Sequence, residues 1–226
     1  MTEHEIHAQP RDIQPCLILF NGFPGVGKLT LAKSFQEALQ LQQSNTTTRL
    51  IDNHVLIDPV EAIEPGRTPA HYTLRKAIRK AAFDGLKALE HGVVILMTTC
   101  LAANAADREV FEEYVEVAFA RGIPCISINV CCDEAINEQR LCSEERRGVR
   151  EGGGKTKLVD KDVLASMRRE HVLLDAEVHL EGGETRGVNI RQWRLDTSSL
   201  SVEEAVHGIF DLFCRDVATG GHGVAF

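Results

Sequence analysis

The sequence lacks the features that mark several large classes of protein. Its 226 residues include 25 Lys and Arg against 33 Asp and Glu, which gives a net charge of −8. Proteins that bind DNA or RNA need a cationic surface to displace counterions, so no nucleic-acid partner is expected. No apolar run approaches the roughly 18 residues that a membrane span needs, so no membrane partner is expected either.

Cysteine is present but lacks the spacing of a metal site or a disulfide framework. The seven cysteines are an odd number, none forms a Cys-x-x-Cys pair, and most lie in or beside apolar runs such as PCLILF and PCISINVCC. We therefore expect free thiols in a reducing compartment. The polar N-terminus MTEHEIHAQPRDIQ lacks the apolar core of a signal peptide, so we expect a cytoplasmic protein.

What the sequence does contain is an alternation of short apolar runs and helical patterns. Residues 16–22, 93–101 and 125–132 are apolar without alternation, which is typical of strands buried on both faces. A short segment at 49–53 and an alternating one at 189–197 complete five predicted strands. Helix-period segments separate them, so we predict an α/β fold with a parallel sheet covered on both faces. Such sheets bind ligands beyond the carboxyl ends of their strands.

The predicted domain organisation is a single domain with two short tails. Residues 1–15 and 219–226 are predicted to be flexible, around one domain at 16–218. Within that domain, a basic and glycine-rich loop precedes a helix that is predicted to run from Asp160 to about Leu174.

A glycine-rich loop follows the first predicted strand and opens a helix. It places Gly22, Gly25 and Gly27 directly before Lys28. Glycines allow the backbone to turn so that successive N–H groups point at one spot, and the helix N-terminus adds partial positive charge. A lysine at this place reaches the β- and γ-phosphates of a nucleotide. The alternative is a structural turn with an incidental lysine.

The residue after that lysine is Leu29, where the strict phosphate-loop motif has a Ser or Thr that binds magnesium. The hydroxyl comes one place later, at Thr30, and Pro24 and Val26 complete the loop. The arrangement Gly-x-Pro-Gly-x-Gly-Lys-x-Thr resembles that of the nucleoside monophosphate kinases. This resemblance implies a P-loop NTPase fold with strand order 2-3-1-4-5. It also implies that residues 22 and 24–30 bind ATP, with Thr30 holding Mg²⁺ partly through water.

The second predicted strand ends in Asp52, followed by Asn53 and His54. This pattern is similar to chloramphenicol phosphotransferase and the zeta-toxin kinases, in which an aspartate after the second strand acts as the catalytic base. The resemblance implies that Asp52 deprotonates a substrate hydroxyl or holds a magnesium-bound water, with Asn53 and His54 beside the substrate. The alternative is that Asp52 caps a helix beginning near His54 and that the histidine is packed.

The third predicted strand ends without the acidic residue that many P-loop enzymes use for magnesium. Thr98 and Thr99 stand there instead. Two hydroxyls can contact a phosphate or a metal-bound water, but they supply no charge. This departure leaves more of the metal binding to Asp52, or else indicates that catalysis has been lost.

Basic residues gather late in the chain, within a predicted lid at about 140–160. In the kinases named above, arginines at this place close over the phosphates, which implies catalytic roles for Arg140 and Arg146. The alternative is a solvated helix whose arginines are balanced by Glu144 and Glu145.

Two further segments complete the predicted site. Asp196 and Thr197 fall in an LDTS segment that resembles the turn near adenine in the same kinases, although local capping also explains them. Between the second and third strands, Arg67 and Arg75 are candidates to bind an anionic acceptor, or they belong to the wet face of a helix.

The sequence therefore predicts a P-loop kinase that uses ATP and Mg²⁺ to phosphorylate a hydroxyl of a small-molecule acceptor. The resemblance covers most of residues 16–213. Two alternatives stay open. One is a nucleoside monophosphate kinase, which the loop favours, and the other is a nucleotide-binding regulator without turnover, which the missing acid favours.

Overall fold

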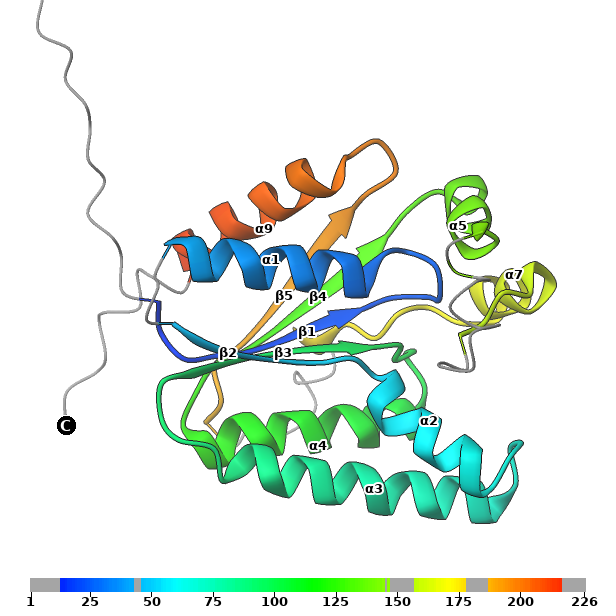
Figure 1. Cartoon of the computed structure of the whole chain (residues 1–226), viewed down its shortest axis with the longest axis horizontal. Helices are drawn as coiled ribbons and strands as arrows, with labels where there is room; N and C mark the ends of the chain where they lie inside the picture. The colour runs from blue at the N-terminus through cyan, green and yellow to red at the C-terminus, as the bar shows by residue number, and fades with distance from the viewer. Residues whose placement is uncertain (1–12, 43–45, 145, 147–156, 178–186, 217–226) are drawn as a thin grey trace, which may run out of the picture.

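The computed structural model of the chain describes residues 13–42, 46–144, 146, 157–177 and 187–216. Its centre is a five-stranded parallel sheet with the order β2-β3-β1-β4-β5 (Figure 1). The predicted α/β fold and strand order are therefore confirmed. The strands are β1 (Leu17–Asn21), β2 (Thr47–Ile51), β3 (Val93–Thr99), β4 (Cys125–Cys131) and β5 (Ile190–Asp196).

Helices cover both faces of this sheet. On one face α1 (Lys28–Gln42) lies beside α9 (Val202–Asp216), and on the other α3 (Pro69–Lys87) lies beside α4 (Ala105–Arg121) (Figure 1). Three further helices lie toward the carboxyl ends of the strands: α2 (His54–Ile63), α5 (Glu134–Leu141) and α7 (Lys161–Glu170).

The core consists of two apolar layers, one on each face of the sheet. Because side chains alternate along a strand, Phe20 of β1 packs toward α1 and α9, where the rings of Phe35 and Phe213 lie 5.8 Å apart. Leu19 packs toward α3 and α4 on the opposite face. Burial on both faces explains why β1 and β3 are apolar up to the polar residues at their carboxyl ends, and why most of β4 is apolar.

The helix predicted at 160–174 is shorter than expected. It ends at Glu170, and the following segment pairs with the residues after β3 instead. The Ala103 N–H donates to Val172 O at 2.8 Å, and the Leu174 N–H donates to Leu101 O at 3.0 Å. These hydrogen bonds satisfy backbone N–H and C=O groups of the extended segment, so it does not need to be helical. They also fix the loop after β3 at the carboxyl edge of the sheet.

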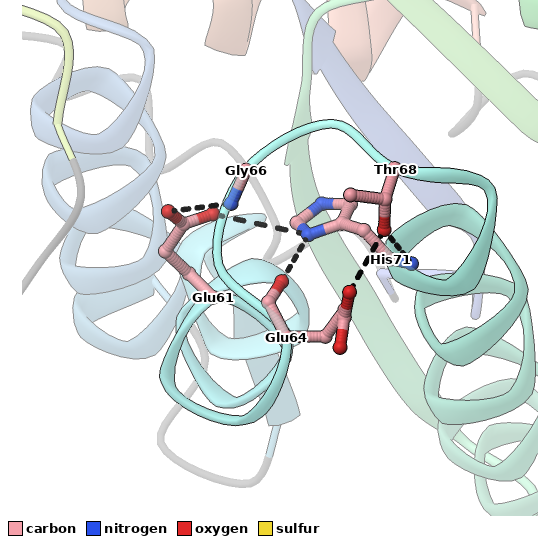
Figure 2. Close-up of polar contacts among 5 residues, drawn as sticks. All are labelled: Glu61, Glu64, Gly66, Thr68 and His71. Carbon is pink, nitrogen blue, oxygen red and sulfur yellow. Dashed lines mark hydrogen bonds and ion pairs between the residues drawn. The ribbon is translucent and has the colours of Figure 1, made fainter.

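The turn between α2 and α3 is held by its own side chains (Figure 2). Thr68 caps α3 by accepting the His71 N–H at 3.1 Å, and its hydroxyl donates to Glu64 at 2.9 Å. The buried His71 ring donates from Nδ1 to Glu64 O at 2.8 Å, and the Gly66 N–H bonds Glu61 at 3.3 Å. The two helices therefore form one hairpin beside the carboxyl edge of the sheet.

The predicted tails fall almost entirely outside the described residues, as do residues 147–156 of the predicted lid. Ile13, placed in the N-terminal tail from sequence, packs against the core layer of α1 and α9. All seven cysteines are free thiols, and three of them, Cys16, Cys125 and Cys132, are buried. Among the helices of the described ranges, none is both long and apolar enough to cross a lipid bilayer.

Candidate active site

The glycine loop between β1 and α1 has the backbone conformation that its composition predicts. Gly25 and Gly27 have φ angles of +89° and +94°, which residues with a Cβ rarely adopt. At Gly22 a Cβ would lie 2.5 Å from Val130 O, so that only glycine fits. The buried Val26 anchors the loop in the core. The loop is thus a rigid turn leading into the N-terminus of α1, the arrangement that binds anions.

Lys28 is the first residue of α1, and its ammonium lies at the phosphate loop. It donates to Gly22 O at 2.6 Å and to Phe23 O at 2.9 Å. Burial lowers the pKa of Lys28 to about 8; neighbouring Cys100 raises it, and the charge of Arg146 lowers it. The ammonium has two carbonyl partners that a phosphate can replace.

A cavity of about 350 Å³ lies beside this loop. Thr30 is exposed and lines the cavity, whereas Leu29 is half-buried and does not line it. The hydroxyl one place after the usual position is therefore the one that faces the predicted nucleotide. The other lining residues come from the loop, α1, α5, the ends of the predicted lid, the β5–α9 turn and α9: Gly25, Val26, Gly27, Leu31, Arg140, Ser143, Arg146, Lys157, Thr197, Leu200, Ser201, Val202 and Ala205.

Arg140 contacts the far wall of this cavity. Its Nη1 and Nη2 donate to Oγ1 and O of the buried Thr197, each at 2.9 Å. The exposed Asp196 accepts instead from the N–H and hydroxyl of Ser198, which lowers the pKa of Asp196. Of the two residues predicted near adenine, Thr197 lines the cavity and Asp196 forms its own turn. Arg140, predicted to act on the phosphates, is hydrogen-bonded to Thr197 at this wall of the cavity.

Asp52 follows β2, and its carboxylate is buried and oriented by β3. The Thr98 hydroxyl donates to Asp52 Oδ1 at 2.8 Å, while its oxygen accepts the Asn53 N–H at 2.9 Å. The N-cap position of α2 is Asn53, whose side chain makes no capping bond. Asp52 is thus held across the sheet edge by a neighbouring strand.

Both threonine hydroxyls at the end of β3 already have protein partners. Thr98 bonds Asp52, and Thr99 bonds the buried phenol of Tyr114, whose pKa is raised by burial. These bonds join the end of β3 to Asp52 and to α4, and a contact of either hydroxyl with a phosphate or a substrate stays a prediction. Within the described ranges, no group of three or more His, Cys, Asp or Glu side chains is arranged to hold a metal ion.

Arg146 lies close to both Lys28 and Asp52. Its charge lowers the pKa of Lys28, and Asp52 in turn raises the pKa of Arg146 against a larger lowering caused by burial. Its Nε donates to Leu158 O at 2.8 Å, which joins the two ends of the predicted lid. Two cations and one carboxylate therefore converge next to the phosphate loop.

His54 lies on the first turn of α2, within electrostatic range of Asp52. Its Nδ1 lies 3.2 Å from Asp58 Oδ1, and its side chain is 20% exposed. Burial lowers its pKa, while the hydrogen bond to Asp58 and the charge of Asp52 oppose that shift. The histidine is therefore paired within its own helix and lies beside Asp52.

The two arginines predicted to bind an acceptor lie in different environments. Arg67 is exposed in the α2–α3 turn. Arg75 is half-buried on α3, and it has no hydrogen-bond or ion-pair partner among the described residues. Burial and the charge of Arg79 lower its pKa, and both Arg75 and Lys28 lower the pKa of Cys100 against a larger increase caused by burial. Arg75 and Lys28 therefore both lie within electrostatic range of Cys100, and Arg75 does not line the cavity.

Three neighbours of the site carried no recognisable sequence signal. Lys157 and Ser143 line the cavity, and Cys100 lies between Lys28 and Arg75. Lys157 was visible only as part of a basic segment, and Cys100 only as an apolar residue after a strand. Their places follow from the fold, which brings the ends of β1 and β3 and the base of the predicted lid together.

Solved structures of two kinases and of Kti12 have similar folds. A gluconokinase from Sinorhizobium meliloti 1021 has 14% identity and a TM-score of 0.53, covering 92% of this chain and 95% of that one. The Mycobacterium tuberculosis APS kinase, solved with AMPPNP and APS, has 16% identity and a TM-score of 0.53, covering 88% and 97%. Kti12 from Chaetomium thermophilum, solved with ADP-AlF3, has 15% identity and a TM-score of 0.51, covering 86% and 97%.

These likenesses, together with the strand order, show that the chain has the P-loop NTPase fold in its kinase form. No family model matches the sequence, and no curated protein matches it. The fold comparison covers 95–97% of each of these three structures.

Proposed function

We propose that this protein is a nucleotide-dependent phosphotransferase that moves the γ-phosphoryl group of ATP to a hydroxyl of a small molecule. The observation that carries the proposal is the convergence of Lys28, Asp52 and Arg146 beside a phosphate loop and a cavity of about 350 Å³. The fold shared with gluconokinase and APS kinase structures supports the same class of reaction.

The cavity is the proposed site of the nucleoside. Its walls are apolar at Leu31 and Ala205, which suits a base, and Thr197 offers a polar edge. From there the phosphates would run along the loop toward Lys28, whose ammonium would exchange two backbone carbonyls for phosphate oxygens. Arg146 would neutralise charge on the group in transfer.

Asp52 is the proposed general base. In the proposed step the acceptor oxygen bonds to the γ-phosphorus, the bond from that phosphorus to the β–γ bridging oxygen breaks, and ADP leaves with the electron pair. The proton of the acceptor hydroxyl passes to Asp52. The hydrogen bond from Thr98 would keep the carboxylate pointing at that proton.

Magnesium would accompany the nucleotide. Mg²⁺ prefers oxygen ligands and keeps several waters, and at nucleotide sites it needs only one or two protein ligands. Thr30 and Asp52 supply such oxygens near the loop, so the residues present fit this ion. When bound, Mg²⁺ would neutralise phosphate charge.

At the acceptor end, we infer that the substrate carries a carboxylate or a phosphate. Arg75 is a half-buried guanidinium with no hydrogen-bond or ion-pair partner in the part of the chain that the structure describes, whereas Arg79, one turn along α3, is paired with Glu113 at 2.6 Å. A desolvated cation is costly unless an anion neutralises it. Asn53 and His54 would border the same substrate, with Arg67 farther out in the α2–α3 turn.

The direct test is a phosphoryl-transfer screen with Mg·ATP over a broad library of hydroxyl compounds, alongside calorimetric titration with ATP. We expect at least one acceptor to be phosphorylated by the wild-type protein, and K28A to lose both affinity and transfer. The proposal is wrong if no acceptor is phosphorylated and K28A binds ATP as tightly as the wild type.

Two other functions are supported by specific observations. The Leu29–Thr30 pair favours a nucleoside monophosphate kinase, which transfer from ATP to AMP, CMP, UMP or GMP would reveal. The lack of an acidic residue at the end of β3 favours a regulator that binds ATP without turnover. Tight ATP binding without ADP formation in the presence of every acceptor would support the regulator.

A further inference from the structure

The outer side of the phosphate loop is attached to α5 through one amide side chain. Asn137 is fully buried on that helix, and its Nδ2 donates to Pro24 O at 2.8 Å. The fit is close, because a Cβ added at Gly25 would lie 2.7 Å from the same nitrogen. Asn137 therefore touches the loop from behind, on the side away from the cavity that Gly25 lines.

Arg168 of α7 fixes the orientation of that amide. Its Nη1 donates to Asn137 Oδ1 at 3.0 Å, and its Nη2 donates to Cys132 O at 3.2 Å. The guanidinium also lies over the ring of Phe23, 6.0 Å from its centre. Because a guanidinium only donates, the Asn137 oxygen must face Arg168, and its NH₂ must face Pro24.

The hydrogen bond to Pro24 O also fixes the direction of the Gly25 N–H, because both belong to one peptide group. None of the described residues is joined by a cis peptide bond, and in a trans peptide the C=O and N–H point in opposite directions. With Pro24 O held against α5, the N–H of Gly25 points away from α5 and toward the loop interior. No hydrogen bond within the described residues uses that N–H.

We propose that Asn137 is a positioning residue, itself positioned by Arg168, that aims the Gly25 N–H at the phosphates of the nucleotide. This inference rests on the proposed function, since it assumes that the loop binds phosphates. Glycine at position 25 has little intrinsic preference for one orientation of the preceding peptide, so the hydrogen bond from α5 supplies the preference.

The substitution N137D tests the direction of that peptide. It keeps the size of the side chain and the acceptor for Arg168 but replaces the NH₂ with an oxygen facing Pro24 O. Two facing acceptors repel, and rotation of the Pro24–Gly25 peptide would turn the Gly25 N–H toward the new carboxylate. The loop would then lose one donor to the phosphates, and ADP affinity is expected to fall by about 10- to 100-fold.

The measurement is calorimetric titration of the full chain with Mg·ADP and, separately, with adenosine. Adenosine has no phosphates, so its affinity is expected to stay within about twofold in N137D, a split that a general loss of structure would not produce. R168Q removes the bond to Asn137 without placing a charge in the buried site, and we expect it to weaken ADP by about tenfold. Arg169 is exposed beside it, and R169Q is the matched control, expected to bind as the wild type does.

The proposal is overturned if N137D or R168Q, folded by circular dichroism, binds ADP as tightly as the wild type, or if adenosine and ADP weaken equally. Failure of the proposed function has a different signature, because a wild-type protein that binds Mg·ADP but phosphorylates no acceptor is not a phosphotransferase, while the ADP affinities of N137D and R168Q still decide the role of Asn137. A wild-type protein that binds neither ADP nor ATP would overturn both proposals.

Discussion

The Thr98 hydroxyl donates a hydrogen bond of 2.8 Å to the carboxylate of Asp52, and its oxygen accepts the Asn53 N–H at 2.9 Å. A side chain at the end of β3 thus fixes both the carboxylate and the backbone after β2. We predict that T98V, which keeps the shape but removes the hydroxyl, lowers kcat by about tenfold or more because the base loses its orientation. The ATP dissociation constant should stay near the wild-type value. Steady-state kinetics with the acceptor found by screening would measure both.

The control for this experiment is T98S, which keeps the hydroxyl and should retain most of the kcat. D52N should lower kcat further than T98V while leaving ATP bound. If T98V and T98S have the same kcat, the hydrogen bond to Asp52 has no catalytic role. If D52N keeps wild-type turnover, Asp52 is not the base.

The lowered pKa of Lys28 leads us to predict that nucleotide affinity depends on pH. Burial lowers its pKa to about 8 in the ligand-free protein, and neighbouring phosphate charge would raise that pKa when a nucleotide binds. Because the nucleotide prefers the protonated lysine, affinity should be constant below about pH 8 and fall above it, by up to about tenfold per pH unit. Titration with ADP at pH 7, 8, 9 and 9.5 measures the slope.

The matched variant is K28R, which keeps a positive charge throughout this pH range. Its ADP affinity should be weaker than that of the wild type at pH 7, because the guanidinium differs in shape, but it should not decline between pH 8 and 9.5. A wild-type affinity that is flat from pH 7 to 9.5 would show that Lys28 does not contact the phosphates through its charge.

The fold was predictable because each strand has a local signature. The apolar runs of β1, β3 and β4 indicate burial on both faces, and the glycines before Lys28 indicate the turn after β1. The strand order came from the resemblance of that loop to known kinases. The predicted end of α7 was wrong, because residues after Glu170 form hydrogen bonds with the loop after β3, a distant segment that the local helical pattern does not reveal.

The roles of individual polar side chains were less predictable, since they depend on residues far away in the sequence. Thr98 and Asp52 are 46 positions apart, and Asn137 and Pro24 are 113 apart. Asn137 is one of several polar residues on a charged helix, and nothing in its neighbours distinguishes it. Arg140 and Thr197 are likewise far apart in the sequence, so their two hydrogen bonds could not be predicted from it.

The ion pair between α3 and α4 predicts a stability effect separate from activity. Arg79 makes two hydrogen bonds to Glu113, at 2.6 and 2.9 Å, and its side chain is only 10% exposed. R79M keeps much of the apolar stem but leaves Glu113 unpaired, so the free energy of unfolding should fall by about 1–3 kcal/mol. Urea unfolding measures it. K80M breaks an exposed pair one position along and should leave the urea midpoint unchanged.

From the position of Arg75 we predict that the enzyme prefers anionic acceptors. It is half-buried and has no hydrogen-bond or ion-pair partner among the described residues, so its guanidinium can bind a carboxylate or phosphate on the acceptor. In matched pairs of compounds, such as gluconate with glucose or AMP with adenosine, the anionic member should have the higher kcat/KM. R75Q should lower kcat/KM for the anionic member by about 10- to 100-fold through KM, and should leave the neutral member and ATP nearly unchanged. R67Q, at an exposed position in the α2–α3 turn, is the comparison and should have a smaller effect. If neutral and anionic acceptors are used equally well and R75Q does not distinguish them, Arg75 does not bind the acceptor, and the phosphotransferase proposal stands without it.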